Sequence, residues 1–170
     1  IEYLQKNYNI NLFSLHDELF FYDKKRVEKF INKKKRRKLK FRWSSSFHIN
    51  LLKNKDIYSD EFLLNLKKEG MFYNGLGVES GSTSQLKRYR KNILPEDVIK
   101  VVKRFERLKI LLTYSFMIGS PYETYENMID TAKLIYKMRF LSPKYAYITG
   151  PVLFRPYPGA DIYKDAICMG

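Results

Sequence analysis

Cysteine is almost absent from this chain: Cys168 is the single cysteine among 170 residues. One thiol cannot form an internal disulfide framework, and it cannot build a metal site from cysteines alone. Proteins of oxidising compartments often depend on disulfides, whereas cytoplasmic proteins keep their thiols reduced. The cysteine count therefore favours a cytoplasmic protein.

Long hydrophobic runs are also missing. No segment approaches the roughly 18 consecutive apolar residues that a membrane-spanning helix requires. The chain opens with Ile-Glu-Tyr-Leu-Gln-Lys, which lacks the charged start and the apolar stretch of a signal peptide. We therefore expect no membrane span in this chain. It also opens without methionine, so we expect it to be a fragment of a longer protein.

Acidic residues are too few to balance the basic ones: 18 stand against 32, which gives a net charge of +14. Such an excess is typical of nucleic-acid-binding proteins, and nucleic acid is an alternative partner for this chain. However, the charge is concentrated in Lys33 to Lys40, and no glycine–aromatic ribonucleoprotein pattern lies nearby. The chain is also rich in Lys, Asn, Ile and Tyr together, a bias that A/T-rich coding produces by itself. We therefore interpret the basic run as a solvated helix end and do not favour nucleic-acid binding.

What the chain does contain is a regular alternation of apolar, strand-like runs and helical segments. The runs are Ile10 to Leu15, Leu39 to Trp43, Phe72 to Val78, Leu111 to Ile118 and Tyr145 to Leu153. Successive runs start roughly 30 to 40 residues apart, which is the size of a βαβ unit. This alternation predicts one α/β domain over residues 1–170, with a parallel sheet and helices outside it.

Residues typical of helix ends support this interpretation. Ser59 precedes an apolar pattern that stops at Gly70, as expected of an N-cap and a C-terminal glycine. Ser82 and Gln85 fit a capping box that opens a helix after the central strand. Pro95 suits the first turn of a further helix.

Two helical stripes are predicted to face the core. The first consists of Val98, Val101, Val102 and Phe105, which follow the i, i+3, i+4, i+7 spacing. The second consists of Met128, Ala132, Ile135 and Met138, on a helix that either Ser120 or Thr124 caps.

Polar groups follow each predicted strand. The carboxyl ends of parallel strands share one edge of the sheet, which is where α/β proteins bind ligands. The residues expected there are Asp17 and Glu18, Ser44 to His48, Glu79 and Ser80, Gly119 and Ser120, and Arg155 to Tyr157. Glu79 stands out, because a buried carboxylate needs a partner. The basic run precedes a strand, so it lies towards the opposite edge.

Five segments carry a family pattern in the same order as the strands. They are Phe13-Ser-Leu-His-Asp-Glu-Leu-Phe20, Phe41-Arg-Trp-Ser-Ser-Ser-Phe-His48, Gly75-Leu-Gly-Val-Glu-Ser-Gly-Ser82 with Leu86 and Lys91, Phe116-Met-Ile-Gly-Ser-Pro-Tyr-Glu-Thr124, and Arg155-Pro-Tyr-Pro-Gly-Ala-Asp-Ile-Tyr163. Each segment is weak alone, but their common order and spacing are specific. Together they resemble the radical S-adenosylmethionine (radical SAM) enzymes. The closest resemblance is to the subgroup often fused to a cobalamin-binding domain, which includes the anaerobic magnesium-protoporphyrin ester cyclase-like proteins.

The resemblance implies a partial (β/α)6 TIM-type barrel and a set of cofactors. In the family, three cysteines in a C-x3-C-x2-C loop bind a [4Fe–4S] cluster, and SAM chelates its fourth iron. An electron from a donor such as flavodoxin or ferredoxin passes through the cluster and cleaves SAM to a 5′-deoxyadenosyl radical. In this subgroup the outcome is often methyl transfer or a ring-forming oxidation, with cobalamin as a further cofactor. The substrate stays unknown.

The chain departs from the family at this loop, because it contains none of the three cysteines. One explanation is truncation: the intact protein would be a radical SAM enzyme, and its cluster ligands would lie outside this chain. Evolutionary loss is the alternative, and it would leave a clusterless, non-enzymatic barrel. In either case we expect this chain alone to be inactive.

The resemblance also assigns roles to single residues near SAM. Glu79 and Ser80 correspond to the fourth-strand pair that contacts the ribose or the methionyl part of SAM; the alternative for Glu79 is an ion pair or a helix cap. Asp17 and Glu18 stand where the family presents acids near the methionyl amino group or the substrate, or else they form a polar exit loop. His48 replaces a common arginine, so it either bonds the SAM carboxylate or is a structural histidine.

The remaining assignments concern adenine and the substrate. Met117, Ile118 and Gly119 correspond to the segment that passes the adenine ring, although an apolar strand core fits Met117 and Ile118 equally well. Arg155 and Tyr157 belong to the exit loop that shapes the substrate end of the barrel, and a rigid turn is the alternative. No metal ligand is expected within the chain.

Overall fold

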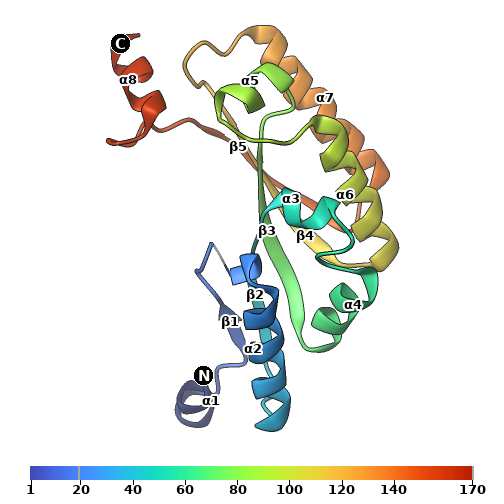
Figure 1. Cartoon of the computed structure of the whole chain (residues 1–170). Helices are drawn as coiled ribbons and strands as arrows, with labels where there is room; N and C mark the ends of the chain where they lie inside the picture. Colours follow the sequence, from blue (N-terminus) through green and yellow to red (C-terminus); the bar gives the residue numbers. More distant parts are fainter. Residues whose placement is uncertain (19, 170) are drawn as a thin grey trace.

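Five parallel strands lie side by side in the order in which they occur along the chain (Figure 1). The structure, a computed structural model, describes residues 1–18 and 20–169. Its elements are α1 (Glu2–Tyr8), β1 (Leu12–Ser14), the 3-10 helix η1 (Phe20–Tyr22), α2 (Lys24–Arg36), β2 (Arg42–Phe47), α3 (Ile49–Lys53), α4 (Asp60–Lys68), β3 (Met71–Glu79), α5 (Thr83–Arg88), α6 (Pro95–Leu108), β4 (Leu111–Ile118), α7 (Tyr125–Leu141), β5 (Ala146–Leu153) and α8 (Asp161–Cys168).

Every neighbouring pair of strands is parallel, and each connection between them contains at least one helix. Helices α2, α4, α6 and α7 cover one face of the sheet, whereas α8 extends away from the body of the molecule (Figure 1). We call the face opposite α6 and α7 the open face. The predicted α/β fold with a parallel sheet is confirmed, and the carboxyl ends of all five strands lie at one edge.

The second strand differs from its predicted bounds. It begins at Arg42, three residues after the expected Leu39, and continues to Phe47. The delay has a physical cause: Lys38 takes a left-handed φ of 54°, and the N–H of Leu39 still donates to the carbonyl of Lys34 at 3.1 Å. The end of α2 therefore uses residues that an apolar pattern alone assigns to the strand. As a result, only His48 of the predicted stretch Ser44 to His48 lies beyond the strand.

The core lies between the sheet and the helices that cover it. Leu76 and Val78 of β3 and Phe116 of β4 are at most 2% exposed. The predicted stripe of α6, made of Val98, Val101, Val102 and Phe105, is buried against them. Since strand side chains alternate between faces, burial of Leu76 and Val78 directs Gly75 and Gly77 to the open face.

Most of the predicted helix ends are confirmed. Ser59 accepts the N–H of Phe62, Pro95 starts α6, and Gly70 takes a φ of +91°. The capping box expected from Ser82 is wrong, because its hydroxyl makes no cap bond. It contacts Asn127 of α7 instead, with the side-chain amide donating at 2.9 Å.

Helix α7 begins at the second of its two predicted caps. Thr124 accepts the N–H of Asn127, while the Asn127 side chain accepts the N–H of Thr124. The predicted buried face is rotated, since Ala132 is exposed and Thr131, Leu134 and Met138 are the buried residues.

The basic run lies at the amino-terminal edge of β2, as predicted. Part of it is paired: Lys34 and Lys35 contact Glu69, and Arg37 contacts Glu2. Within the described residues, no helix is long and apolar enough to cross a membrane.

Candidate functional site

Glu79 and Lys91 form an ion pair at the carboxyl end of the central strand. Nζ of Lys91 lies 2.9 Å from Oε1 of Glu79, and it also donates to the carbonyl of Gly77 at 2.8 Å. Both side chains are 22% exposed, so the pair is sheltered and still reachable from solvent. The site thus presents an anchored carboxylate beside an anchored ammonium group.

The backbone around this pair is unusual. Glu79 has a φ of 76°, in the left-handed region, which costs a non-glycine residue roughly 1–2 kcal/mol. Pairing with β4 shifts register between Gly77 and Glu79. A Cβ at Gly77 would lie 2.3 Å from Oε1 of Glu79 and 3.0 Å from Nζ of Lys91. Only glycine at position 77 leaves room for the pair to lie over the strand.

Ser80 points elsewhere, although it follows Glu79 directly. Its side chain is fully buried, and its hydroxyl lies 3.1 Å from that of Thr131 in α7. It also accepts the N–H of Ser82. The hydroxyl is thus part of the contact between the strand end and α7, and only its backbone is free to meet a ligand at this edge.

His48 lies at the end of β2, next to the ion pair. It caps α3, because Nδ1 accepts the N–H of Asn50 at 3.3 Å. Burial lowers the pKa of His48 below 6.5, and the positive charges of Lys91 and Lys53 lower it further. The ring is therefore neutral at pH 7, with its proton on Nε2 as a donor.

Asp17 and Glu18 both lie beyond β1, which ends at Ser14. The two side chains are therefore not directed to opposite faces of the sheet by the alternation of a strand. The carboxylate of Asp17 lies 3.0 Å from the guanidinium of Arg26 in α2. Glu18 is exposed. The structure brings neither carboxylate to Glu79 through a direct bond.

Ile118 is the last residue of β4 and Gly119 follows it, beside the end of β5. The carbonyl of Ile118 accepts the N–H of Phe154, and Gly119 takes a φ of +76°. The N–H of Gly119 donates to the carboxylate of Glu123, which thus binds backbone just before α7.

Arg155 and Tyr157 line a cavity of about 750 Å³ at the ends of β4 and β5. Its other walls are apolar side chains: Met117, Val152, Leu153 and Phe154. The volume lies within the range of small-molecule pockets. Met117 is the β4 side chain that reaches this cavity, whereas Ile118 is not in its lining.

One residue of the site was missed as a functional candidate. Lys91 belongs to the family pattern but had no role assigned, and its distance of twelve residues from Glu79 matches no helix or strand period. Met117 was predicted beside the adenine ring, and the structure places it in the lining of the cavity that Arg155 and Tyr157 share. The pairing of β4 with β5 shifts register between Ser115 and Met117, and irregular pairing of this kind has no signature in the sequence.

The donor set decides which cofactors these residues fit. A carboxylate and an ammonium group side by side complement the amino and carboxylate groups of a methionyl zwitterion, so Glu79 and Lys91 fit SAM. An iron–sulfur cluster does not fit: the one cysteine, Cys168, is exposed on α8. In the described ranges no group of three or more His, Cys, Asp or Glu side chains converges on a metal position.

A parallel α/β sheet with helices on one face and a polar ligand edge defines a partial barrel of the TIM type. Comparisons with known proteins identify the family more narrowly. The sequence profile of the Radical SAM superfamily matches residues 1–135. The chain belongs to the radical SAM superfamily, a family of enzymes.

Relatives confirm the resemblance to the cobalamin-associated, ester cyclase-like subgroup. An uncharacterized methyltransferase of Pyrococcus horikoshii is 29% identical over 164 residues, which cover 96% of this chain and 33% of the relative. The anaerobic magnesium-protoporphyrin IX monomethyl ester cyclase of Rubrivivax gelatinosus is 25% identical over 166 residues, covering 97% of this chain and 28% of the cyclase.

Solved structures share the fold. The cobalamin-dependent S-adenosylmethionine radical enzyme OxsB, with aqua-cobalamin bound, superposes with a TM-score of 0.66 at 19% identity. The match covers 76% of this chain and 20% of OxsB. The chain thus spans a third or less of the length of these proteins.

Proposed function

We propose that the carboxyl edge of the sheet binds SAM, with Glu79 and Lys91 holding its methionyl group. The paired opposite charges carry this proposal, because each has a counterpart on the methionyl zwitterion. Bonds between fixed charged groups are roughly twice as strong as neutral ones. In the absence of ligand the two side chains satisfy each other, so neither is left as an unpaired charge.

Neighbouring residues complete the proposed site. His48, neutral and with Nε2–H as a donor, is placed to bond an oxygen of the ligand. Ile118 and Gly119 offer a strand end for the adenine ring, since glycine allows close backbone approach. Arg155 and Tyr157 line the cavity proposed for the substrate, while Asp17 and Glu18 are proposed at the far side of the barrel mouth.

We further propose that the full-length protein is a cytoplasmic radical SAM enzyme that transfers a methyl group or modifies its substrate by radical chemistry. A [4Fe–4S] cluster, with ligands outside this chain, would supply the electron that cleaves SAM, and flavodoxin or ferredoxin would deliver it. Cobalamin is a further candidate cofactor, supported by the cobalamin-bound relative. The residues of this chain would bind and orient SAM and exclude water from it.

Nucleic-acid binding through Lys33 to Lys40 has less support, because ion pairs with Glu69 and Glu2 already engage part of the run. We therefore retain it only as an alternative.

Equilibrium binding of SAM to the full-length protein tests the proposal. Glu79→Gln should weaken binding by at least about tenfold, because a hydrogen bond to a charged group contributes roughly 1.5–3 kcal/mol. Glu28→Gln is the matched control, since Glu28 is exposed on α2. The double variant Glu79→Lys with Lys91→Glu keeps an ion pair but reverses its direction, and it should bind as weakly as Glu79→Gln. Wild-type affinity in the reversed variant would contradict the assignment.

A further inference from the structure

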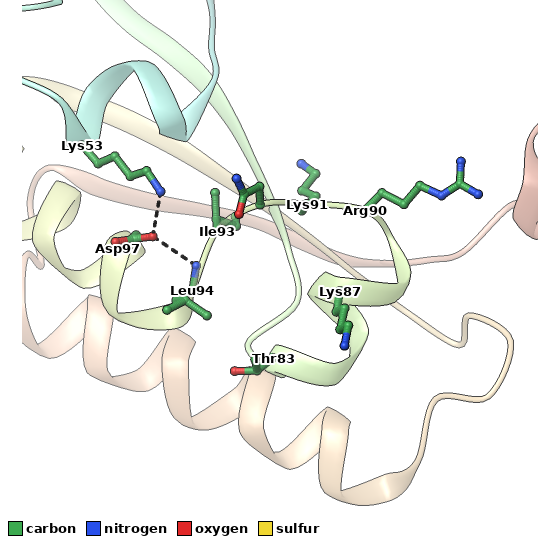
Figure 2. A pocket seen from close by; sticks show the side chains of 9 residues that line it. Lys53, Thr83, Lys87, Arg90, Lys91, Ile93, Leu94 and Asp97 are labelled. Atoms are coloured by element: carbon green, nitrogen blue, oxygen red, sulfur yellow. Dashed lines mark hydrogen bonds and ion pairs between the residues drawn. The ribbon is translucent and has the colours of Figure 1, made fainter.

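A second cavity, of about 480 Å³, opens beside the ligand edge between α3, α5 and the loop that joins α5 to α6 (Figure 2). Four cationic side chains line it: Lys53, Lys87, Arg90 and Lys91. The single acidic residue in its lining is Asp97, among the residues that the structure describes. This cavity is separate from the one that Arg155 and Tyr157 line.

The partners of these cations leave part of the positive charge uncompensated. Lys53 contacts Asp97, as Figure 2 shows, and Lys100 contacts the same carboxylate. Lys91 contacts Glu79, and Arg90 contacts Asp161. Lys87 makes no ion pair with any described residue. The four cations of the lining thus have three carboxylate partners, which leaves the charge of Lys87 uncompensated, and Lys100 shares the carboxylate of Asp97 from outside the lining.

Two of the cations are available to a ligand. The pair of Arg90 and Asp161 is 80% and 75% exposed, and such solvated pairs contribute at most about 1 kcal/mol. Lys87, on α5, is exposed. The loop adds neutral donors, because the backbone N–H groups of Asn92 and Ile93 bond to no acceptor in the described part of the chain.

We propose that this cavity binds a phosphate group, with Lys87 and Arg90 as its main ligands. A phosphate monoester carries about −1.5 to −2 charges at pH 7, which matches the charges of Lys87 and of Arg90, whose ion pair is solvated. Arginine offers a fork of N–H donors that fits phosphate oxygens, and lysine adds a point charge. A carboxylate would leave one of the two charges unmatched.

The position of the cavity identifies which molecule carries the phosphate. Lys91 reaches both the lining and Glu79, so the phosphate would bind beside the proposed SAM site. The phosphate would therefore belong to the substrate. This assignment rests on the proposed function, whereas the binding of phosphate in the cavity does not depend on it. Two sources fit: a phosphorylated small molecule, or the phosphodiester backbone of RNA.

A neighbouring basic cavity distinguishes these sources. It has a volume of about 360 Å³, shares Lys53 with the first, and is lined by Lys55, Lys103 and Arg107 among others. An RNA strand would extend into it, whereas a small phosphate ester would occupy the first cavity alone.

Titration calorimetry of the full-length protein at low salt, without SAM, tests the proposal. The probes are inorganic pyrophosphate and a single-stranded RNA of about twelve nucleotides. The double variant Lys87→Gln with Arg90→Gln should weaken binding by at least about tenfold. Asp161→Asn should strengthen it by up to about fivefold, because it releases Arg90. Lys144→Gln is the control, since Lys144 is exposed and unpaired within the described residues.

The outcomes separate the sources and the two proposals. Pyrophosphate binding that Lys103→Gln leaves unchanged supports a small phosphate ester, and RNA binding that Lys103→Gln weakens supports RNA. Equal binding by the Lys87 and Arg90 double variant and Lys144→Gln overturns the phosphate site. The double variant should keep wild-type SAM affinity, so failure of the phosphate site is distinguishable from failure of the SAM site.

Discussion

At the scale of single residues, Glu79 combines a strained backbone with a sheltered charge. A left-handed φ at a glutamate persists only where the surrounding structure enforces it, and such strain is concentrated at ligand sites. Here the register shift and Lys91 provide that enforcement. The combination supports the proposal that Glu79 is placed for binding.

Glu79→Gly separates these two roles. Glycine relieves a strain of roughly 1–2 kcal/mol, which offsets the loss of a partly exposed ion pair and the extra freedom of the unfolded chain. We expect the free energy of unfolding to change by less than about 1 kcal/mol, while SAM affinity falls at least about tenfold. Chemical denaturation and equilibrium binding measure the two quantities. A large loss of stability with normal SAM binding would assign Glu79 a structural role.

His48 predicts a pH dependence of stability. Because its pKa is lower in the folded state than in the unfolded state, unfolding takes up a proton between the two values. Its contribution is fully present above pH 6.5 and is lost as the pH falls through the folded-state pKa. His48→Asn retains a good N-cap but does not titrate, so unfolding curves should show a shallower loss of stability below pH 6.5. His16→Asn is the control, because His16 is exposed after β1; an equal change in both variants would contradict the assignment.

At the scale of elements, the order of strands and helices was predictable because apolar alternation and capping residues are local signals. Ser59, Gly70 and Pro95 act within one helical turn of their positions in the chain. The capping box at Ser82 failed because its hydroxyl meets Asn127, 45 residues away. The pairing of Glu79 with Lys91 escaped prediction for the same reason: it depends on how the loop after α5 folds back over the strand.

Gly81, in the turn after β3, packs directly against the backbone of α7. A Cβ at Gly81 would lie 2.5 Å from the carbonyl oxygen of Asp130 and 2.6 Å from Cα of Thr131, both in the backbone of α7. Gly81→Ala must therefore displace α7, and we expect a loss of about 2 kcal/mol in the free energy of unfolding. Gly75→Ala is the comparison, because its Cβ would meet only a movable hydroxyl, that of Ser46 at 3.3 Å. Equal denaturation midpoints for the two variants would contradict this packing.

At the scale of the whole molecule, the first and last strands of the sheet, β1 and β5, have no neighbour on their outer side among the described residues. Near the end of β5, Val152 and Leu153 are 59% and 72% exposed. An unpaired strand edge with exposed apolar side chains favours association with other chains.

We therefore expect the isolated chain of 170 residues to associate in a concentration-dependent manner. Leu153→Lys should reduce this association, because a charge on an edge strand opposes pairing. Leu64→Lys, on the exposed side of α4, adds the same charge away from that edge and should have little effect. Sedimentation measures both, and a soluble wild-type monomer with two-state unfolding would contradict the expectation.

We propose that the carboxyl edge of this sheet holds SAM between Glu79 and Lys91, and a crystal structure of the full-length protein with SAM would show this contact. We expect the methionyl amino group within hydrogen-bond distance of the Glu79 carboxylate, and the methionyl carboxylate against Nζ of Lys91. SAM bound elsewhere, with Glu79 and Lys91 still paired only to each other, would contradict it.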